Sequence, residues 1–223
     1  MSRRTRVVWL LCGVASAIGL VVVALLVLRT SPGDAVDRWL SRVVLDGLPA
    51  ILRRGLDALA RPMLLVALAP VDVALALLAV VRRGWRRVGV AVLVVAVSAG
   101  VTTTIDAPAL LGLPGEGYPS DHATLGFALV VALGVLWPRP LGRLGLGVGA
   151  ALAVVVGVGN VSWYAHRPVD VLGSALLVAS ATALSVALLG GDAANVRVGD
   201  RASSQIRSDA CRETRSEARS EAD

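Results

Sequence analysis

Six apolar stretches, each close to the length of a membrane-spanning helix, constrain this chain more than any other feature. They cover residues 7–28, 63–81, 88–105, 122–137, 144–161 and 169–189, the fourth being the shortest. A helix needs about 20 apolar residues to cross a hydrocarbon core, whereas spanning strands alternate in segments of about ten. The chain is 56% hydrophobic, so six such helices leave no polar surface for a soluble globule. The sequence predicts an all-α bundle of six transmembrane helices.

The remaining segments divide the chain into four parts. Residues 1–28 begin with three arginines and resemble a signal peptide, but the apolar stretch is too long for one and no cleavage pattern follows it, so we interpret it as a span. Residues 29–62 form a loop in which apolar residues recur at helical spacing, which predicts an amphipathic helix on the membrane interface or an ordinary packed helix. Residues 63–189 form the transmembrane core, and the polar residues 190–223 a disordered tail.

Basic residues beside the spans predict the orientation in the membrane. Arginines cluster at the N-terminus, between the second and third spans, and between the fourth and fifth. Because such residues favour the cytoplasmic side, we expect both termini inside the cell and the loop 29–62 outside, although that loop also carries arginines. The expected location is the cell membrane.

The only two histidines, His122 and His166, lie where polar loops meet apolar stretches. Both loops follow odd-numbered spans, so both face the outer side. Asp170 lies one helical turn beyond His166, where it can accept a hydrogen bond from one imidazole nitrogen and leave the other free to attack. His122 can protonate a leaving group. Ser120 precedes a helix start, where backbone N–H groups favour an anion, although its hydroxyl can equally cap the helix. The pattern indicates phosphoryl transfer without a metal.

Two short segments resemble a known family. Residues 119–122, Pro-Ser-Asp-His, resemble the Pro-Ser-Gly-His motif of the type 2 phosphatidic acid phosphatases. Residues 166–173, His-Arg-Pro-Val-Asp-Val-Leu-Gly, resemble the end of their Ser-Arg-x5-His-x3-Asp motif. The resemblance covers about residues 63–189. It implies that His166 attacks phosphorus, Asp170 orients His166, His122 protonates the leaving alkoxide, and water then hydrolyses the phosphohistidine.

The resemblance also implies the substrate and surroundings of the site. The expected substrate is a lipid or polyprenyl phosphate monoester or diphosphate, bound at the outer membrane face. Neither a metal nor another cofactor is implied, and no nucleic acid partner is expected. The candidate substrate-binding residues are Ser120, Asp121, Arg167 and Asn160.

Positive charges that the family uses are missing at the corresponding positions. The Lys-x6-Arg-Pro motif would begin at Gly100 and end at Ala107-Pro108, and the arginine of the third motif corresponds to Asn160. Asp121 replaces a glycine and adds a negative charge. Loss of one transition-state donor commonly costs about 10²–10³ in rate, so uncompensated losses would abolish useful catalysis.

Two features offer compensation. Arg167 is expected to pair with Asp121 or to face the pocket; alternatively, it extends to the lipid headgroups. Arg54 and Arg61-Pro62 reproduce an Arg-x6-Arg-Pro spacing in the loop 29–62, two spans too early for the order of motifs in the family.

Two other functions are compatible with the sequence. One is a catalytically silent relative that binds an anionic lipid headgroup or a partner protein. The other is a transporter, which is disfavoured because the middle portions of the spans carry no charge except Asp72, interpreted as lying near an outer end.

Overall fold

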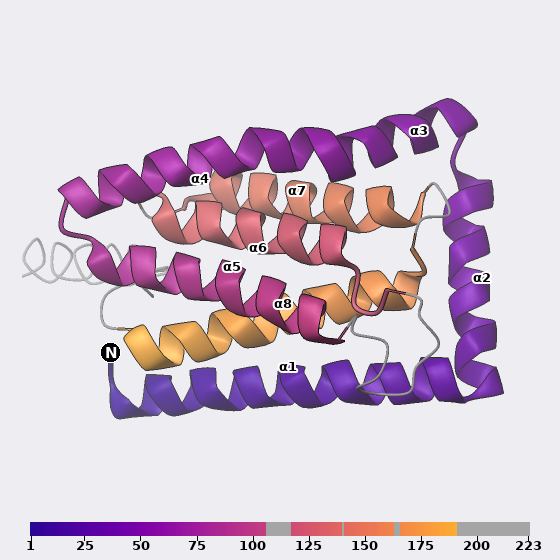
Figure 1. Ribbon diagram of the computed structural model, residues 1–223, viewed down its shortest axis with the longest axis horizontal. Helices are drawn as coiled ribbons and strands as arrows, with labels where there is room; N and C mark the ends of the chain where they lie inside the picture. Colours follow the sequence, from indigo (N-terminus) through magenta and orange to yellow (C-terminus); the bar gives the residue numbers. More distant parts are fainter. Residues whose placement is uncertain (106–116, 140, 163–165, 191–223) are drawn as a thin grey trace, which may run out of the picture.

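The computed structural model describes residues 1–105, 117–139, 141–162 and 166–190, and these residues form helices and no strand. Six helices lie roughly side by side in Figure 1: α1 (Arg3–Arg29), α4 (Leu64–Val81), α5 (Trp85–Ile105), α6 (Asp121–Leu136), α7 (Arg143–Val161) and α8 (Pro168–Leu189). A seventh, α2 (Ser31–Gly47), crosses one end of this bundle. The predicted all-helical fold class is confirmed.

Five segments of the described part of the chain are long and apolar enough to cross a membrane. These are Arg3–Val27, Ala50–Val81, Trp85–Thr104, Arg143–Val161 and Pro168–Leu189. Helix α6, which corresponds to the predicted fourth span, has only 16 residues. At 1.5 Å per residue it covers about 24 Å of a hydrocarbon core of about 30 Å. Five candidate spans are therefore established, and the sixth stays a prediction.

Helix α2 is amphipathic, with its apolar side turned away from the bundle. The hydroxyl of Thr30 caps it by accepting a hydrogen bond from the N–H of Gly33 at 3.2 Å. Val36 and Trp39 are more than half exposed, whereas Asp37 is buried. Exposed apolar side chains on a helix that lies across the bundle end suit a position in the membrane interface.

The predicted second span, residues 63–81, is the second part of a longer continuous helix that begins well before residue 63. Helix α3 (Ala50–Ala58) continues through a wide π-helical turn, η1 (Leu59–Met63), directly into α4. Pro62 lies inside this turn and has no N–H to donate to a helical ladder. Such π-helical turns occur frequently at functional sites.

The segment formed by α3 and η1 packs closely on the end of α7. A Cβ atom on Gly159 would lie 2.4 Å from the Cβ of Ala60 and 2.5 Å from the carbonyl oxygen of Leu56, so only glycine allows this approach. Three residues later, the hydroxyl of Ser162 donates a hydrogen bond to the carbonyl of Arg53 at 3.1 Å. These contacts bring the end of α7 against α3 and η1.

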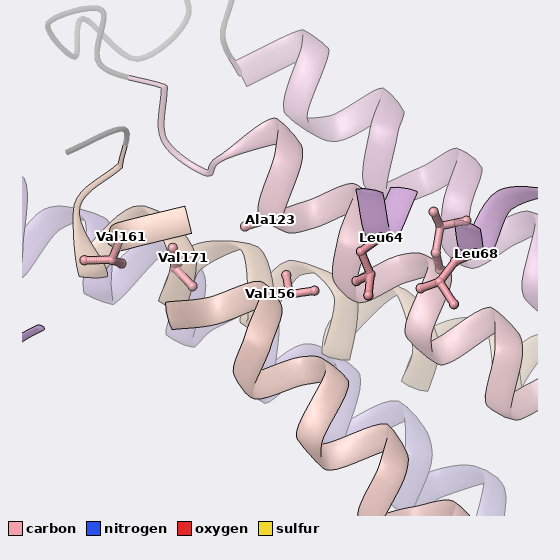
Figure 2. Close-up of a cluster of buried hydrophobic side chains, with 7 residues drawn as sticks. Leu64, Leu68, Ala123, Val156, Val161 and Val171 are labelled. Atoms are coloured by element: carbon pink, nitrogen blue, oxygen red, sulfur yellow. The ribbon is translucent and has the colours of Figure 1, made fainter. Parts of the chain in front are cut away.

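A buried apolar cluster connects the ends of four helices. Figure 2 shows its side chains, which come from α4, α6, α7 and α8: Leu64, Leu68, Ala123, Leu129, Val156, Val161 and Val171. Three of them directly follow candidate site residues, since Ala123 follows His122, Val161 follows Asn160 and Val171 follows Asp170. Burial of these neighbours anchors each of these candidate residues beside the same apolar cluster.

Helix α1 runs beside α8 along most of its length (Figure 1). The buried hydroxyl of Ser180 donates to the carbonyl of Gly13 at 2.9 Å, and the hydroxyl of Tyr118 donates to the carbonyl of Leu20 at 2.7 Å. The first apolar stretch is thus an integral part of the helical bundle.

Asp72 departs from its expected position. The sequence interpretation placed it near an outer end, but the structure places it in the middle of α4, where it is only 7% exposed. Neither carboxylate oxygen has a hydrogen-bond partner among the described residues. Among those residues, Asp72 therefore has no paired charge of the kind that transporters use inside their spans.

Candidate functional site

The two histidine-bearing segments meet where α6 and α8 begin. The N–H of Ser120 donates to the carbonyl of Asp170 at 3.3 Å. The buried hydroxyl of Ser174 lies 3.0 Å from the carbonyl oxygen of Ser120 and 2.9 Å from that of Asp170. This buried network joins the loop before His122 to the first turn of the helix that follows His166.

Gly117 brings the backbone of the same loop directly against the His166 imidazole. A Cβ atom built on Gly117 would lie 3.6 Å from Cε1 and 3.8 Å from Nδ1 of His166. Gly117 has a φ of +52°, which only glycine adopts without strain. The close approach and the left-handed backbone both explain a glycine here, and they place Gly117 beside the imidazole.

Asp170 lies beside His166 but does not hydrogen-bond to it at the observed separation. The Asp170 Oδ2 atom is 3.9 Å from His166 Nδ1, and it accepts a hydrogen bond from the N–H of Arg167 at 2.9 Å. This bond fixes the buried carboxylate at the start of α8. An approach of about 1 Å would complete the imidazole hydrogen bond, and such bonds are often long before substrate binds.

His166 is neutral at ordinary pH because of its surroundings. Burial is the main cause that lowers the pKa of His166 to about 4; Arg61 and His122 contribute electrostatically in the same direction, while Asp121 acts in the opposite direction. A neutral imidazole has a free nitrogen lone pair, which a nucleophile requires. The same influences show that Arg61, His122 and Asp121 all lie near enough to His166 to act on its charge.

Ser120 and Asn160 are both fully buried. The Ser120 hydroxyl caps α6 by accepting a hydrogen bond from the N–H of Ala123 at 3.3 Å, which favours the capping role over contact with a ligand. Asn160 Nδ2 donates to the carbonyl of Val156 at 2.8 Å. Its Oδ1 atom has no hydrogen-bond partner among the residues that the structure describes. Substrate contact by either residue stays a prediction.

Arg167 binds two carboxylates of α2 that the sequence interpretation did not consider. Its Nε donates to Asp37 Oδ2 at 2.5 Å and its Nη2 to Asp34 Oδ1 at 2.6 Å. Asp37 Oδ1 also accepts the N–H of Val169 at 2.8 Å. Burial lowers the pKa of Arg167, but the hydrogen bonds and charges of Asp37 and Asp34 outweigh it, so the pKa is raised. The predicted contact with Asp121 stays a prediction.

Comparison with known proteins agrees with this site. A family model described as the PAP2 superfamily matches residues 98–191, from the second half of α5 to the end of α8. This segment of the chain is similar to the PAP2 superfamily. The predicted family resemblance is confirmed, and the PAP2 segment contains His122, His166 and Asp170. No curated protein and no solved structure gives a significant match.

Several residues that add charge near the site lie before the matched segment in the sequence. Gly100, which corresponds to the family lysine, is exposed on α5 and carries no charge, while Ala107 and Pro108 lie outside the described residues. Arg61 and the two carboxylates of α2 precede the matched segment. The Arg-x6-Arg-Pro spacing was the sequence signal that pointed to Arg61, whereas no signal pointed to Asp34 or Asp37.

Proposed function

We propose that this protein is a membrane-embedded phosphatase that hydrolyses a lipid or polyprenyl phosphate or diphosphate through a phosphohistidine on His166. The observation that carries this proposal is the neutral His166 imidazole, held beside the Asp170 carboxylate and within the electrostatic reach of His122. Because Nδ1 faces Asp170, the attacking atom is Nε2.

The reaction then has two displacements at phosphorus. In the first, Nε2 of His166 forms a bond to phosphorus while the bond to the alkoxide or phosphate leaving group breaks, and His122 supplies the proton that the leaving oxygen takes up. In the second, water attacks the phosphohistidine, gives its proton back to His122, and releases His166. Asp170 stabilises the positive charge that His166 carries in the intermediate.

An apolar groove beside the site supports a lipid substrate. It has a volume of about 650 Å³ and lies between α1, α2 and the start of α8. Pro168 and Val169, just after His166, line it, as do Leu26 and Val36. A groove of this character accommodates a hydrocarbon chain while the phosphate headgroup reaches the imidazole.

The position of the arginine clusters supports a site on the outer face. The N-terminus and the turn between α4 and α5 lie at the end of the bundle opposite α2 (Figure 1). Both carry several arginines, which favour the cytoplasmic side. With six spans, counting α6, the histidine site then faces outward from the cell membrane.

Release of inorganic phosphate tests this function. Purified full-length protein in detergent is incubated with a panel of lipid and polyprenyl phosphates, beside the His166→Ala variant. We expect release by the wild type from at least one class and none by the variant. Equal release by both proteins, or by neither from any substrate, would contradict a His166-dependent phosphatase.

A second candidate, a catalytically silent relative, draws support from the missing family cations and from the 3.9 Å between His166 and Asp170. In this second candidate function, the chain binds an anionic lipid headgroup but does not hydrolyse it. Binding of phosphatidic acid vesicles by the wild type, with no phosphate released, would favour it.

A further inference from the structure

A phosphoryl group at His166 needs positive charge beside it, because a phosphate monoester carries up to two negative charges. The PAP2 segment carries no cation at Gly100 or at Asn160, where the family has lysine and arginine. Arg167 is adjacent to His166, but its guanidinium holds the carboxylates of Asp37 and Asp34. Another source of positive charge must come from the elements that pack against the site.

The turn η1 supplies one. Within η1, Ala60 is the sequence neighbour of Arg61 and packs on Gly159 near the end of α7. Ser162, four residues before His166, donates a hydrogen bond to the carbonyl of Arg53 in α3. Leu64, three residues after Arg61, belongs to the same buried cluster as Ala123, which follows His122. The turn that carries Arg61 is thus anchored on both the helix that leads to His166 and the helix that carries His122.

The guanidinium of Arg61 has unused hydrogen-bonding capacity. Its side chain is 27% exposed, and its buried Nε atom has no hydrogen-bond partner among the described residues. Its ion pair with Asp57 spans 3.6 Å from Nη1 to Oδ1, which is too long for a good hydrogen bond. A guanidinium offers five N–H donors in a planar fork that matches phosphate oxygens.

We propose that Arg61 binds the phosphoryl group that His166 attacks, so that a residue outside the family-matched segment supplies the missing positive charge. The identity of the ligand rests on the proposed phosphatase function. Arg61 holds non-bridging oxygens of the phosphate and stabilises the charge that develops on them during the displacement. Arg54, the other member of the Arg-x6-Arg-Pro spacing, is exposed on α3, and the proposal does not extend to it.

Binding of inorganic orthophosphate to the full-length protein tests this role directly. Isothermal titration in detergent compares the wild type with Arg61→Gln and Arg61→Lys. The matched control is Arg42→Gln, which removes the same charge from an exposed position on α2. Loss of one charge-assisted contact predicts binding weaker by about tenfold to a hundredfold in Arg61→Gln, with a smaller loss in Arg61→Lys and none in the control.

A fourth variant separates binding from folding. Asp57→Asn removes the carboxylate that competes for Arg61 and is expected to tighten phosphate binding by about two- to fivefold, the range for an exposed ion pair. A merely destabilised protein would not bind phosphate more tightly. Orthophosphate that fails to bind the wild type, or that binds Arg61→Gln and Arg42→Gln equally, would overturn the proposal.

The same variants distinguish this inference from the proposed function. His166-dependent hydrolysis with unchanged KM and unchanged phosphate binding in Arg61→Gln would remove the role of Arg61 and leave the phosphatase. Arg61-dependent phosphate binding without hydrolysis of any ester would leave the anion site and remove the phosphatase.

Discussion

Two regions of the molecule contribute different things to the candidate site. The family-matched segment, residues 98–191, supplies both imidazoles and the Asp170 carboxylate from the ends of well-packed helices. The preceding region, from α2 to η1, supplies charged groups: the carboxylates of Asp34 and Asp37 and the guanidinium of Arg61. The contrast teaches that the candidate reacting groups and part of their electrostatic setting come from separate parts of this chain.

The two arginines near His166 show the same contrast. Arg167 adjoins His166 in sequence, yet two carboxylates engage its guanidinium, and it connects α2 to the start of α8. Arg61 is distant in sequence, yet its charge acts on His166. Adjacency in sequence is therefore a poor guide to which arginine has donors left to bind a ligand.

The largest expected effect is the loss of the nucleophile from the matched region. His166→Ala should reduce phosphate release from the best lipid phosphate by at least roughly 10⁴-fold, because no covalent intermediate can form. The same variant should still bind orthophosphate if the preceding region supplies the anion contact. If His166→Ala lost orthophosphate binding as well as turnover, the anion contact would depend on the matched region and not on the preceding one.

The next effect concerns His122 as the proton donor. His122→Ala should lower turnover of a lipid phosphate by about 10²–10⁴-fold, the usual worth of general acid catalysis. It should affect p-nitrophenyl phosphate much less, because that leaving group departs without a proton. Initial rates on the two substrates measure the difference, and equal losses on both would argue against a role in protonation.

A stability effect is expected from the contact between the regions. Asp37→Ala should lower the free energy of unfolding by about 2 kcal/mol, because it leaves the buried Val169 N–H and part of the Arg167 guanidinium without an acceptor. Asp34→Ala should cost less than about 1 kcal/mol, since that carboxylate is 32% exposed. Denaturant unfolding in detergent measures the free energy of unfolding of both variants. Equal losses in the two variants would contradict the larger contribution expected from Asp37.

The smallest effect links Arg61 to the titration of His166. The pKa of His166 is lowered to about 4, so the unfolded chain binds more protons than the folded chain between about pH 4 and the ordinary value of about 6.5. Stability should rise with pH through that window and fall as the pH drops through it. Arg61→Gln removes a positive charge and should raise the pKa of His166 in the folded chain. The pH range over which stability changes with this titration should then become narrower.

Histidine NMR can follow this titration, because the chain contains only two histidines. The His122→Asn variant assigns the remaining signal to His166. A wild-type His166 pKa near 6.5, or no change in Arg61→Gln relative to Arg42→Gln, would show that Arg61 does not act on the imidazole.

Much of the architecture follows from local sequence alone. The stretches predicted at 63–81, 122–137 and 169–189 correspond to α4, α6 and α8 with ends that differ by one residue or none. Hydrophobic length is a local property, and Pro168 and Ser120 mark helix starts through equally local chemistry. The resemblance to the PAP2 superfamily also came from short motifs, each contained within a few residues.

What the sequence predicted by itself is thus the helices, the resemblance to the PAP2 superfamily and the candidate residues His122, His166 and Asp170. The tertiary structure decided which charges surround them. Pairing of Arg167 with Asp37, and the reach of Arg61 to His166, depend on how α2 and η1 dock on the ends of α7 and α8. Helical periodicity assigns residues to a face of a helix but does not say which distant helix that face meets. Close packing at Gly159 and burial of Asp37 supply that information.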